Sequence, residues 1–151
     1  MPDQLSITCK SFAQLTTFEL YEILHLRHIV FSIEQKCLYI DTDGFDQQAY
    51  HLMLRERDIL VAYSRLFDVS MPYPGFLSIG RVVTHPEHRN KQYGKHLIQT
   101  SILKIRELFG ELPIKIGAQA YLTGFYTSFG FKDIGQYYLE DGIPHLKMVM
   151  E

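Results

Sequence analysis

The sequence predicts a mixed α/β fold, more narrowly of the α+β class. A mixed, mostly antiparallel sheet of six or seven strands is expected to be flanked by helices. Three observations favour this fold class. Short β-branched runs are bounded by turn residues, two longer segments repeat apolar residues at helical spacing, and hairpin patterns occur toward both ends. With 151 residues the chain has the size of one domain, so we expect a single domain over residues 1–151.

The first elements are a short strand and a helix. Ile7–Lys10 is the predicted strand. Thr16 and Glu19 have the spacing of a capping box, and apolar residues then recur at helical spacing as far as Phe31. Arg27 falls on the apolar face of this helix, where a buried guanidinium needs a partner. We expect a carboxylate from the following loop to pair with it, as a structural ion pair or as part of a substrate site.

The next segment is a loop that leads into a hairpin. Gln35–Gln48 is rich in turn residues and aspartates. Tyr50–Glu56 and Ile59–Asp68 are predicted to pair as strands, with Arg57-Asp58 at the turn between them. Prolines and a glycine then mark an exposed loop over 72–75.

The centre of the chain predicts a strand, a long helix and a second strand. Leu77–His85 is the first strand, and the helix fits from about Asn90 to Phe109, with one apolar face. Gly110 ends this helix. Ile114–Gln119 then has the composition of a buried strand.

The last part predicts a short helix and a hairpin. Apolar residues between Leu122 and Phe129 mark one helix face. Two strands follow, Gln136–Glu140 and His145–Met150, and Asp141-Gly142 turns between them.

Composition excludes several classes of function. The net charge of −2 and a pI near 6.4 argue against a nucleic-acid-binding protein. Two cysteines form no disulfide framework and no metal-ligand spacing, which favours reduced thiols in a cytoplasmic protein without a metal. Met1–Gln4 lacks the features of a signal peptide, and no apolar run is long enough for a membrane span.

The segment Ile79–Lys95 predicts a site for a phosphate-bearing ligand. A β-branched run leads into a polar turn, and basic residues and a glycine then open the long helix. Backbone amides at a helix start, with the helix dipole, hold anions. Arg89, Lys91 and Lys95 add positive charge where it is unfavourable unless an anion compensates it. The alternative is a helix that simply begins with basic residues.

The run Arg89-Asn90-Lys91-Gln92-Tyr93-Gly94 resembles the phosphate turn of the GNAT superfamily of N-acetyltransferases, Arg/Gln-x-x-Gly-x-Gly/Ala. It matches at Arg89 and Gly94, whereas Gln92 replaces the first glycine. The resemblance implies the GNAT fold, with acetyl-CoA as cosubstrate and a splayed strand whose amides around Val82 and Val83 contact the pantetheine and the thioester carbonyl. The residues expected to bind this cosubstrate are Val82, Val83, Thr84, Arg89, Asn90, Lys91, Gln92, Tyr93, Gly94, Lys95 and Phe125.

The segment Phe125–Phe131 resembles the part of GNAT enzymes in which a tyrosine on a short helix precedes a Gly-Phe pair. The resemblance implies that Tyr126 is the general acid for the leaving thiolate. A phenol with an ordinary pKa near 10 is suited to protonating a thiolate of similar basicity. The alternative is that Tyr126 only fills the core.

Two further segments resemble the small ElaA-like subfamily of GNAT proteins. One runs from Arg27 through Val30-Phe31 and Glu34-Gln35 to His51, and the other is the tail from Tyr138 to Met148. The resemblance covers about Leu20 to Met150. It indicates the reaction more firmly than the acceptor.

The acceptor side of the predicted site contains carboxylates and histidines. The acidic loop from Glu34 to Asp46 could orient a cationic amine, or could be an ordinary solvated loop. By residue type, Glu34, His51 and His145 are candidates for the general base, and the sequence does not rank them. The catalytic residues expected are Tyr126, Glu34 and His145. The residues expected to bind the acceptor are Arg27, Glu34, Asp43, His51 and Glu140.

These observations favour an acyltransferase that moves an acetyl group from acetyl-CoA to a primary amine by direct attack in a ternary complex. The acceptor is a small molecule or a peptide, and a homodimer is one expected assembly because GNAT enzymes are often dimers. Nothing places a base beside Cys37, so no acyl-enzyme is expected. Two alternatives are an enzyme similar to acyl-homoserine-lactone synthases and a non-catalytic module that binds or senses acyl-CoA.

Overall fold

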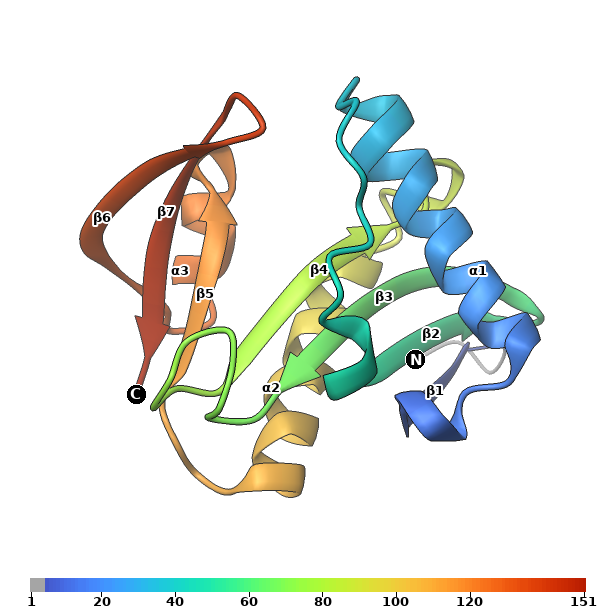
Figure 1. Cartoon of the computed structure of the whole chain (residues 1–151), viewed down its shortest axis with the longest axis horizontal. Coiled ribbons are helices and arrows are strands. Elements are labelled where there is room, and N and C mark those ends of the chain that lie inside the picture. Colours follow the sequence, from blue (N-terminus) through green and yellow to red (C-terminus); the bar gives the residue numbers. More distant parts are fainter. Residues whose placement is uncertain (1–4) are drawn as a thin grey trace.

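The computed structural model describes residues 5–151, which form seven strands and three α-helices (Figure 1). The strands are β1 (Leu5–Ser11), β2 (Tyr50–Glu56), β3 (Ile59–Phe67), β4 (Ser78–Thr84), β5 (Ile114–Gln119), β6 (Lys132–Glu140) and β7 (Ile143–Met150). The helices are α1 (Thr17–Arg27), α2 (Tyr93–Phe109) and α3 (Thr123–Thr127). The expectation that Met1–Gln4 forms no signal peptide lies outside the described residues.

The strands are divided between two antiparallel sheets, ordered β1-β2-β3-β4 and β5-β7-β6. Between residues 5 and 151 the sheets are joined by one parallel bridge, Leu77 to Ile114. Hydrogen bonds from the Leu77 amide to the Pro113 carbonyl (2.9 Å) and from the Lys115 amide to the Leu77 carbonyl (2.8 Å) flank it. Figure 1 shows that β4 and β5 start side by side here and then separate. The number of strands agrees with the prediction, and the separation of β4 from β5, expected from the resemblance, divides the strands into two sheets.

Helices α1 and α2 cover opposite faces of the first sheet, because successive strand residues point to opposite sides. Met53 on β2 packs in a cluster with Ile23 and Leu26 of α1. Its neighbour Leu52 packs in another cluster with Leu97 of α2. In Figure 1 α1 lies in front of this sheet and α2 behind it.

The start of α1 confirms the predicted capping box. The Glu19 amide donates to Thr16 Oγ1 (3.0 Å), and the Thr16 amide donates to Glu19 Oε1 (2.8 Å). The helical path extends past Arg27, but His28–Glu34 is π-helical instead of α-helical. This segment leads the chain from the end of α1 to Glu34.

The start of α2 corrects the prediction, because the helix begins at Tyr93 instead of Asn90. Asn90 and Gln92 have left-handed backbones, with φ of 69° and 59°, and a right-handed helix cannot pass through them. Glycine adopts this conformation without steric cost, which explains why the turn of the expected family has a glycine at the position that Gln92 occupies here. The end of α2 at Gly110 (φ 100°) is as predicted.

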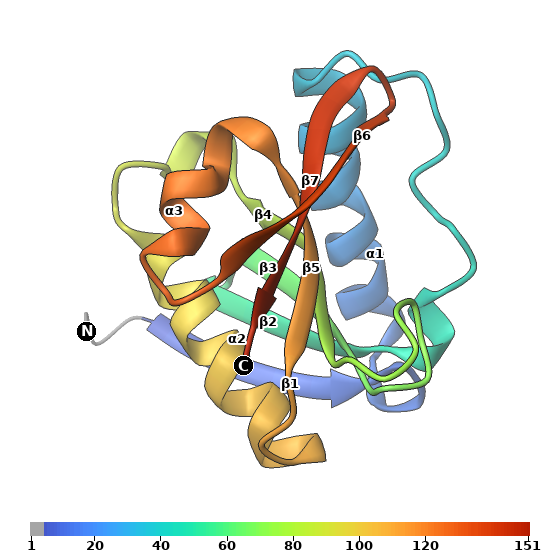
Figure 2. The same cartoon turned by 90° about the vertical axis from the view of Figure 1, so that its left-hand side faces the viewer.

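The short helix α3 packs on one face of the second sheet, where Tyr126 and Phe131 contact apolar residues of β5 and β7. Figure 2 shows α3 on one side of β5 and β7 and α1 on the other. The predicted turns at Arg57-Asp58 and Asp141-Gly142 are confirmed. In the part of the chain that the structure describes, no helix combines the length and the apolar character needed to cross a membrane.

Candidate active site

The separation of β4 from β5 opens a cavity of about 480 Å³. Its walls come from β4, β5, the π-helical segment, the turn before α2, α3 and the β6–β7 turn. The predicted site residues that line it are Glu34, Val82, Val83, Thr84, Arg89, Gly94, Phe125, Tyr126, Glu140 and His145. Segments that are far apart in the sequence thus bring most of the predicted catalytic and cosubstrate-binding groups to one cavity.

A bulge in β4 shapes the wall of this cavity. Val83 pairs with Tyr63 and Gly80 with Arg65, so that two residues of β4, Arg81 and Val82, lie opposite Ser64 alone. Arg81 has a left-handed backbone, with a φ of 46°. A bulge interrupts the ladder and turns backbone groups away from the neighbouring strand. The backbone of Val82 is therefore placed for contact with a ligand in the cavity, whereas Val83 stays in the ladder.

The turn before α2 has the character of an anion site. The first amides of a helix have no acceptor within the helix, and the N-cap residue Gln92 makes no side-chain hydrogen bond to them. The first turn of α2 contains no acidic residue. A Cβ on Gly94 would fall 3.7 Å from Thr84 Cγ2 and 3.8 Å from Phe125 Cζ, and would fill the gap between two cavity-lining side chains. These features fit a pyrophosphate.

Other residues of the turn have their side chains away from the cavity. Lys91 Nζ lies 3.3 Å from Glu56 Oε2, and the Tyr93 side chain is buried beside Leu97. The residues of the expected set that do not line the cavity are Asn90, Lys91, Gln92, Tyr93 and Lys95. A contact between these residues and a phosphate stays a prediction.

Arg89 and Glu34 form an ion pair that joins two walls of the cavity. Arg89 Nη1 and Nη2 each donate to a Glu34 carboxylate oxygen at 2.7 Å. This hydrogen bonding and the charge of the guanidinium lower the pKa of Glu34. A carboxylate held ionised in this way is a weaker base than a solvated one.

Tyr126 lies at the junction of the core and the cavity. Its side chain is 7% exposed and packs edge-on against the rings of Phe125 (5.2 Å between centroids) and Phe131 (6.0 Å). Burial raises the pKa of Tyr126 above its usual range, so the phenol stays protonated through neutral and moderately alkaline pH. The core and catalytic interpretations are therefore compatible for this residue.

His145 is a buried imidazole with a defined tautomer. Its Nδ1 lies 2.7 Å from the Ile143 carbonyl, which can only accept, so Nδ1 donates. In the neutral ring Nε2 then carries the lone pair. A Glu140 carboxylate oxygen lies 3.5 Å from Nε2, where it would stabilise an imidazolium. This arrangement is suited to general-base chemistry.

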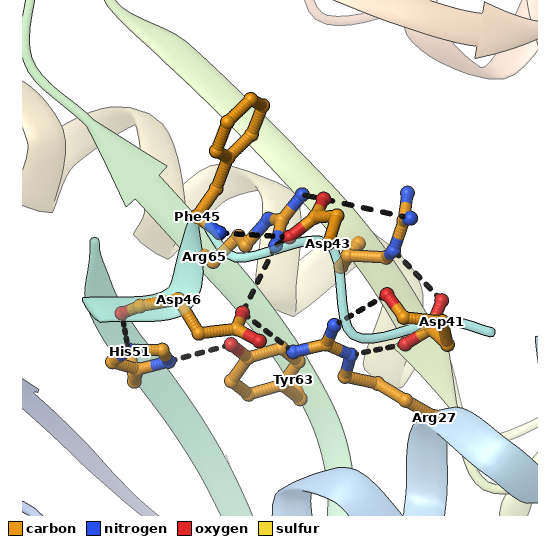
Figure 3. A network of polar contacts seen from close by, with 9 residues as sticks. Arg27, Asp41, Asp43, Phe45, Asp46, His51, Tyr63 and Arg65 are labelled. Atoms are coloured by element: carbon orange, nitrogen blue, oxygen red, sulfur yellow. Dashed lines mark hydrogen bonds and ion pairs between the residues drawn. The ribbon is translucent and has the colours of Figure 1, made fainter. Parts of the chain in front are cut away.

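A buried ion-pair network holds the acidic loop on the first sheet (Figure 3). Arg27 donates to Asp41 Oδ2 (2.6 Å) and to Asp46 Oδ1 (2.7 Å), which confirms that a loop carboxylate pairs with Arg27. Arg65 donates to the same Asp46 oxygen (2.9 Å) and to Asp43. Arg81 Nε lies 2.9 Å from Asp41 Oδ1. The loop aspartates are thus paired with arginines of the protein, and of the three only Asp41 also lines the cavity.

His51 belongs to the same network. Its Nε2 donates to the Asp46 carbonyl (2.9 Å), and its Nδ1 therefore accepts from the Tyr63 hydroxyl (2.6 Å). The side chain is fully buried, and burial lowers the pKa of His51. Arg27, Asp43 and His51 were expected to bind the acceptor, but their polar atoms are engaged by other residues of this network. We correct their role to a structural one.

The network predicts a specific acid sensitivity. Burial by itself would raise the pKa of Asp43, but the hydrogen bonds and charge of Arg65 lower it to about 2 from 3.8. The stabilisation from Asp43 is therefore complete above pH 4 and is lost as the pH falls toward 2. We expect the free energy of unfolding, measured by urea denaturation, to fall steeply over this range. In Asp43→Asn the fall should be shallower; parallel curves for the two proteins would contradict this assignment.

Arg65 and Tyr63 also belong to this network, although neither was among the predicted site residues. Both lie in β3, a strand of apolar appearance, and Arg65 is only 5% exposed. A charged residue inside an apolar strand was an available signal, because it must be paired when buried. Among the described residues, no group of three or more His, Cys, Asp and Glu is placed to hold a metal ion.

Comparison with known proteins adds three findings. Residues 26–151 match the family described as acetyltransferase (GNAT) domain. A UPF0039 protein from Synechocystis sp. is 38% identical over 147 residues, which cover 97% of this chain and 95% of the relative. Two crystal structures superpose closely, and each alignment covers 97% of this chain and 99% of the other: an acyl-CoA N-acyltransferase from Pseudomonas aeruginosa (39% identity, TM-score 0.91) and Escherichia coli ElaA (34% identity, TM-score 0.90).

Proposed function

Because the chain belongs to the acetyltransferase (GNAT) domain family, whose members use acyl-CoA, we propose that it is an N-acetyltransferase that moves an acetyl group from acetyl-CoA to a primary amine. One observation carries the proposal. A single cavity between β4 and β5 collects an uncapped helix start, a protonated phenol and an imidazole with a free lone pair. These are the groups needed for anion binding, acid catalysis and base catalysis.

Acetyl-CoA is held along β4 and at the start of α2. The α2 amides and Arg89 bind the pyrophosphate, and the backbone at the β4 bulge around Val82 binds the pantetheine arm. An amide of this strand directed at the thioester carbonyl stabilises the developing oxyanion. Gly94 leaves the space between Thr84 and Phe125 open for the cosubstrate.

Acetyl transfer occurs by direct attack within the ternary complex. The amine nitrogen forms a bond to the thioester carbonyl carbon, and the carbon–sulfur bond breaks. Tyr126 gives its phenolic proton to the departing thiolate. The ammonium group of the acceptor loses two protons in all. His145 Nε2 accepts the first, and the second passes through solvent to the Tyr126 phenolate and regenerates the phenol.

His145 is a better general base than Glu34 in this arrangement. Its Nδ1 is fixed as a donor by the Ile143 carbonyl, which leaves Nε2 for the proton of the amine. Glu34 is already bound by two donors of Arg89, and its pKa is lowered. Glu34 instead competes with the pyrophosphate of acetyl-CoA for the Arg89 guanidinium.

This competition predicts the effect of Glu34→Gln. Removing the carboxylate releases Arg89, so the KM for acetyl-CoA falls about two- to fivefold, the range expected for an exposed ion pair. The kcat should change less than twofold. Glu107→Gln, at another exposed glutamate, is the control and should change neither constant. An unchanged KM would refute the competition, and a kcat loss above tenfold would make Glu34 the base.

The proposal as a whole is tested by thiol release from acetyl-CoA in the presence of a panel of primary amines. Amine-dependent release supports it. Binding of acetyl-CoA without release for any amine would indicate a sensing module instead. Release only with acyl-carrier-protein thioesters would indicate an enzyme similar to acyl-homoserine-lactone synthases.

A further inference from the structure

Three polar groups converge beside the cavity on the face of the second sheet that is opposite α3. Gly117 of β5 lines the cavity and pairs in register with Lys147 of β7. A Cβ on Gly117 would collide with the Tyr138 hydroxyl, and would lie 3.1 Å from the Tyr73 hydroxyl and 3.5 Å from Lys147 Nζ. The absence of a side chain at Gly117 therefore lets two phenols and an ammonium meet above β5.

This cluster, formed by Tyr73, Tyr138 and Lys147, has positive charge that no carboxylate of the described residues pairs with. Lys147 Nζ donates to the Tyr73 hydroxyl (2.8 Å) and lies 4.2 Å from the centroid of the Tyr138 ring. A second ammonium, that of Lys115, lies 5.3 Å from the Tyr73 ring. Within residues 5–151 neither lysine has a carboxylate oxygen within 4.0 Å, whereas Arg81 and Arg89, the arginines that line the cavity, are both paired. The ammonium and the hydroxyls retain hydrogens for an incoming anion.

The cluster adjoins the proposed general base. His145 and Lys147 are two residues apart on β7 and share a face, which places their Cα atoms about 6.6 Å apart. The Tyr138 ring contacts both, with its centroid 5.3 Å from that of the His145 ring. Glu140, on the same side as His145 Nε2, is an acidic neighbour for an ammonium. Negative and positive groups thus follow one another along this face.

We propose that the Tyr73–Tyr138–Lys147 cluster binds a carboxylate of the acceptor, which is therefore a small amino acid. The amine lies toward His145 and Glu140, and the carboxylate lies toward Lys147, a few bonds away. This inference rests on the proposed acetyl transfer and adds the class of acceptor. The competing explanation is that the cluster only attaches the 68–77 loop to the second sheet.

The experiment compares pairs of acceptors that differ only in the carboxylate. Glycine, β-alanine and 4-aminobutyrate are each assayed against their primary amides by thiol release from acetyl-CoA. In the wild-type protein at least one amino acid should exceed its amide tenfold or more in kcat/KM, because hydrogen bonds to charged groups are strong and an amide lacks the charge. The amino acid with the highest kcat/KM indicates which separation of amine and carboxylate matches the distance between the two subsites.

Variants of Lys147 then assign this preference to the cluster. Lys147→Met keeps an apolar stem over the tyrosine rings and removes the charge. It should lower kcat/KM for the preferred amino acid at least tenfold. The kcat/KM for the amide and the KM for acetyl-CoA should stay within twofold of the wild-type values, and the melting temperature within a few degrees. Lys147→Arg should recover most of the preference. Lys132→Met, at an exposed lysine that begins β6, is the matched control and should have no effect.

The outcomes separate the two proposals. If amides react as well as amino acids in the wild-type protein, or if Lys147→Met slows both equally, the carboxylate site is refuted while acetyl transfer stands. If no acceptor of either series, and no amine of the wider panel, releases thiol, the proposed function fails and this inference fails with it.

Discussion

Replacing Tyr126 with phenylalanine lowers kcat about 100-fold, while the KM for acetyl-CoA stays within twofold. The size is that of a lost general acid. The phenol is buried and lines the cavity, and its raised pKa keeps it protonated, so the wild-type enzyme always has a proton to give. Phenylalanine keeps the edge-on ring contacts with Phe125 and Phe131, so the fold is preserved. Steady-state thiol release measures both constants.

The control is Tyr121→Phe, which removes the hydroxyl of an exposed tyrosine that also lines the cavity. It should leave kcat within twofold. Equal turnover in Tyr126→Phe and the wild type would remove Tyr126 from the mechanism. A rise in KM with kcat unchanged would show that Tyr126 binds acetyl-CoA without acting as the acid.

The second large effect concerns stability: Asp46→Asn lowers the free energy of unfolding by about 3 kcal/mol. One oxygen of Asp46 accepts from both Arg27 and Arg65, whose side chains are 1% and 5–6% exposed. Asparagine keeps the size but removes the charge, so two buried guanidinium groups lose a counter-ion. Urea denaturation at pH 7 measures the loss.

The matched control is Asp58→Asn, at an exposed turn between β2 and β3, which should cost less than 0.5 kcal/mol. Replacing Arg27 by methionine together with Asp46→Asn should cost less than the sum of the two single changes, because it removes a charge as well as its partner. A loss below 1 kcal/mol for Asp46→Asn alone, or strict additivity in the double variant, would contradict the assigned coupling.

Elements governed by local rules could be predicted from the sequence. The capping box at Thr16, the turns at Arg57-Asp58 and Asp141-Gly142, and the helix end at Gly110 depend on neighbouring residues, and all are confirmed. The splay between β4 and β5 was expected only from the resemblance to GNAT proteins, because it depends on pairing between distant strands. The GNAT fold and the similarity to ElaA are both confirmed.

Likewise, the site residues that lie in local sequence patterns could be predicted, whereas those that depend on tertiary contacts could not. Arg89, Tyr126 and His145 lie in segments with recognisable patterns, and the structure brings all three to the cavity. The roles of Arg27, Asp43 and His51 depend on how the acidic loop folds back onto β3, which no spacing along the chain records. The Lys147 cluster likewise requires the register of β5 with β7 and a loop residue, Tyr73, from elsewhere.

The central claim is that the cleft between β4 and β5 binds a CoA thioester with its pyrophosphate on the amides that begin α2. The most direct measurement is a titration of the isotope-labelled protein with CoA, followed by nuclear magnetic resonance of the backbone amides. The largest saturable shifts should occur at Gln92–Lys95 and around Val82, and weaken in Arg89→Met. No shift at millimolar CoA, or shifts confined to surfaces away from this cleft, would contradict the account.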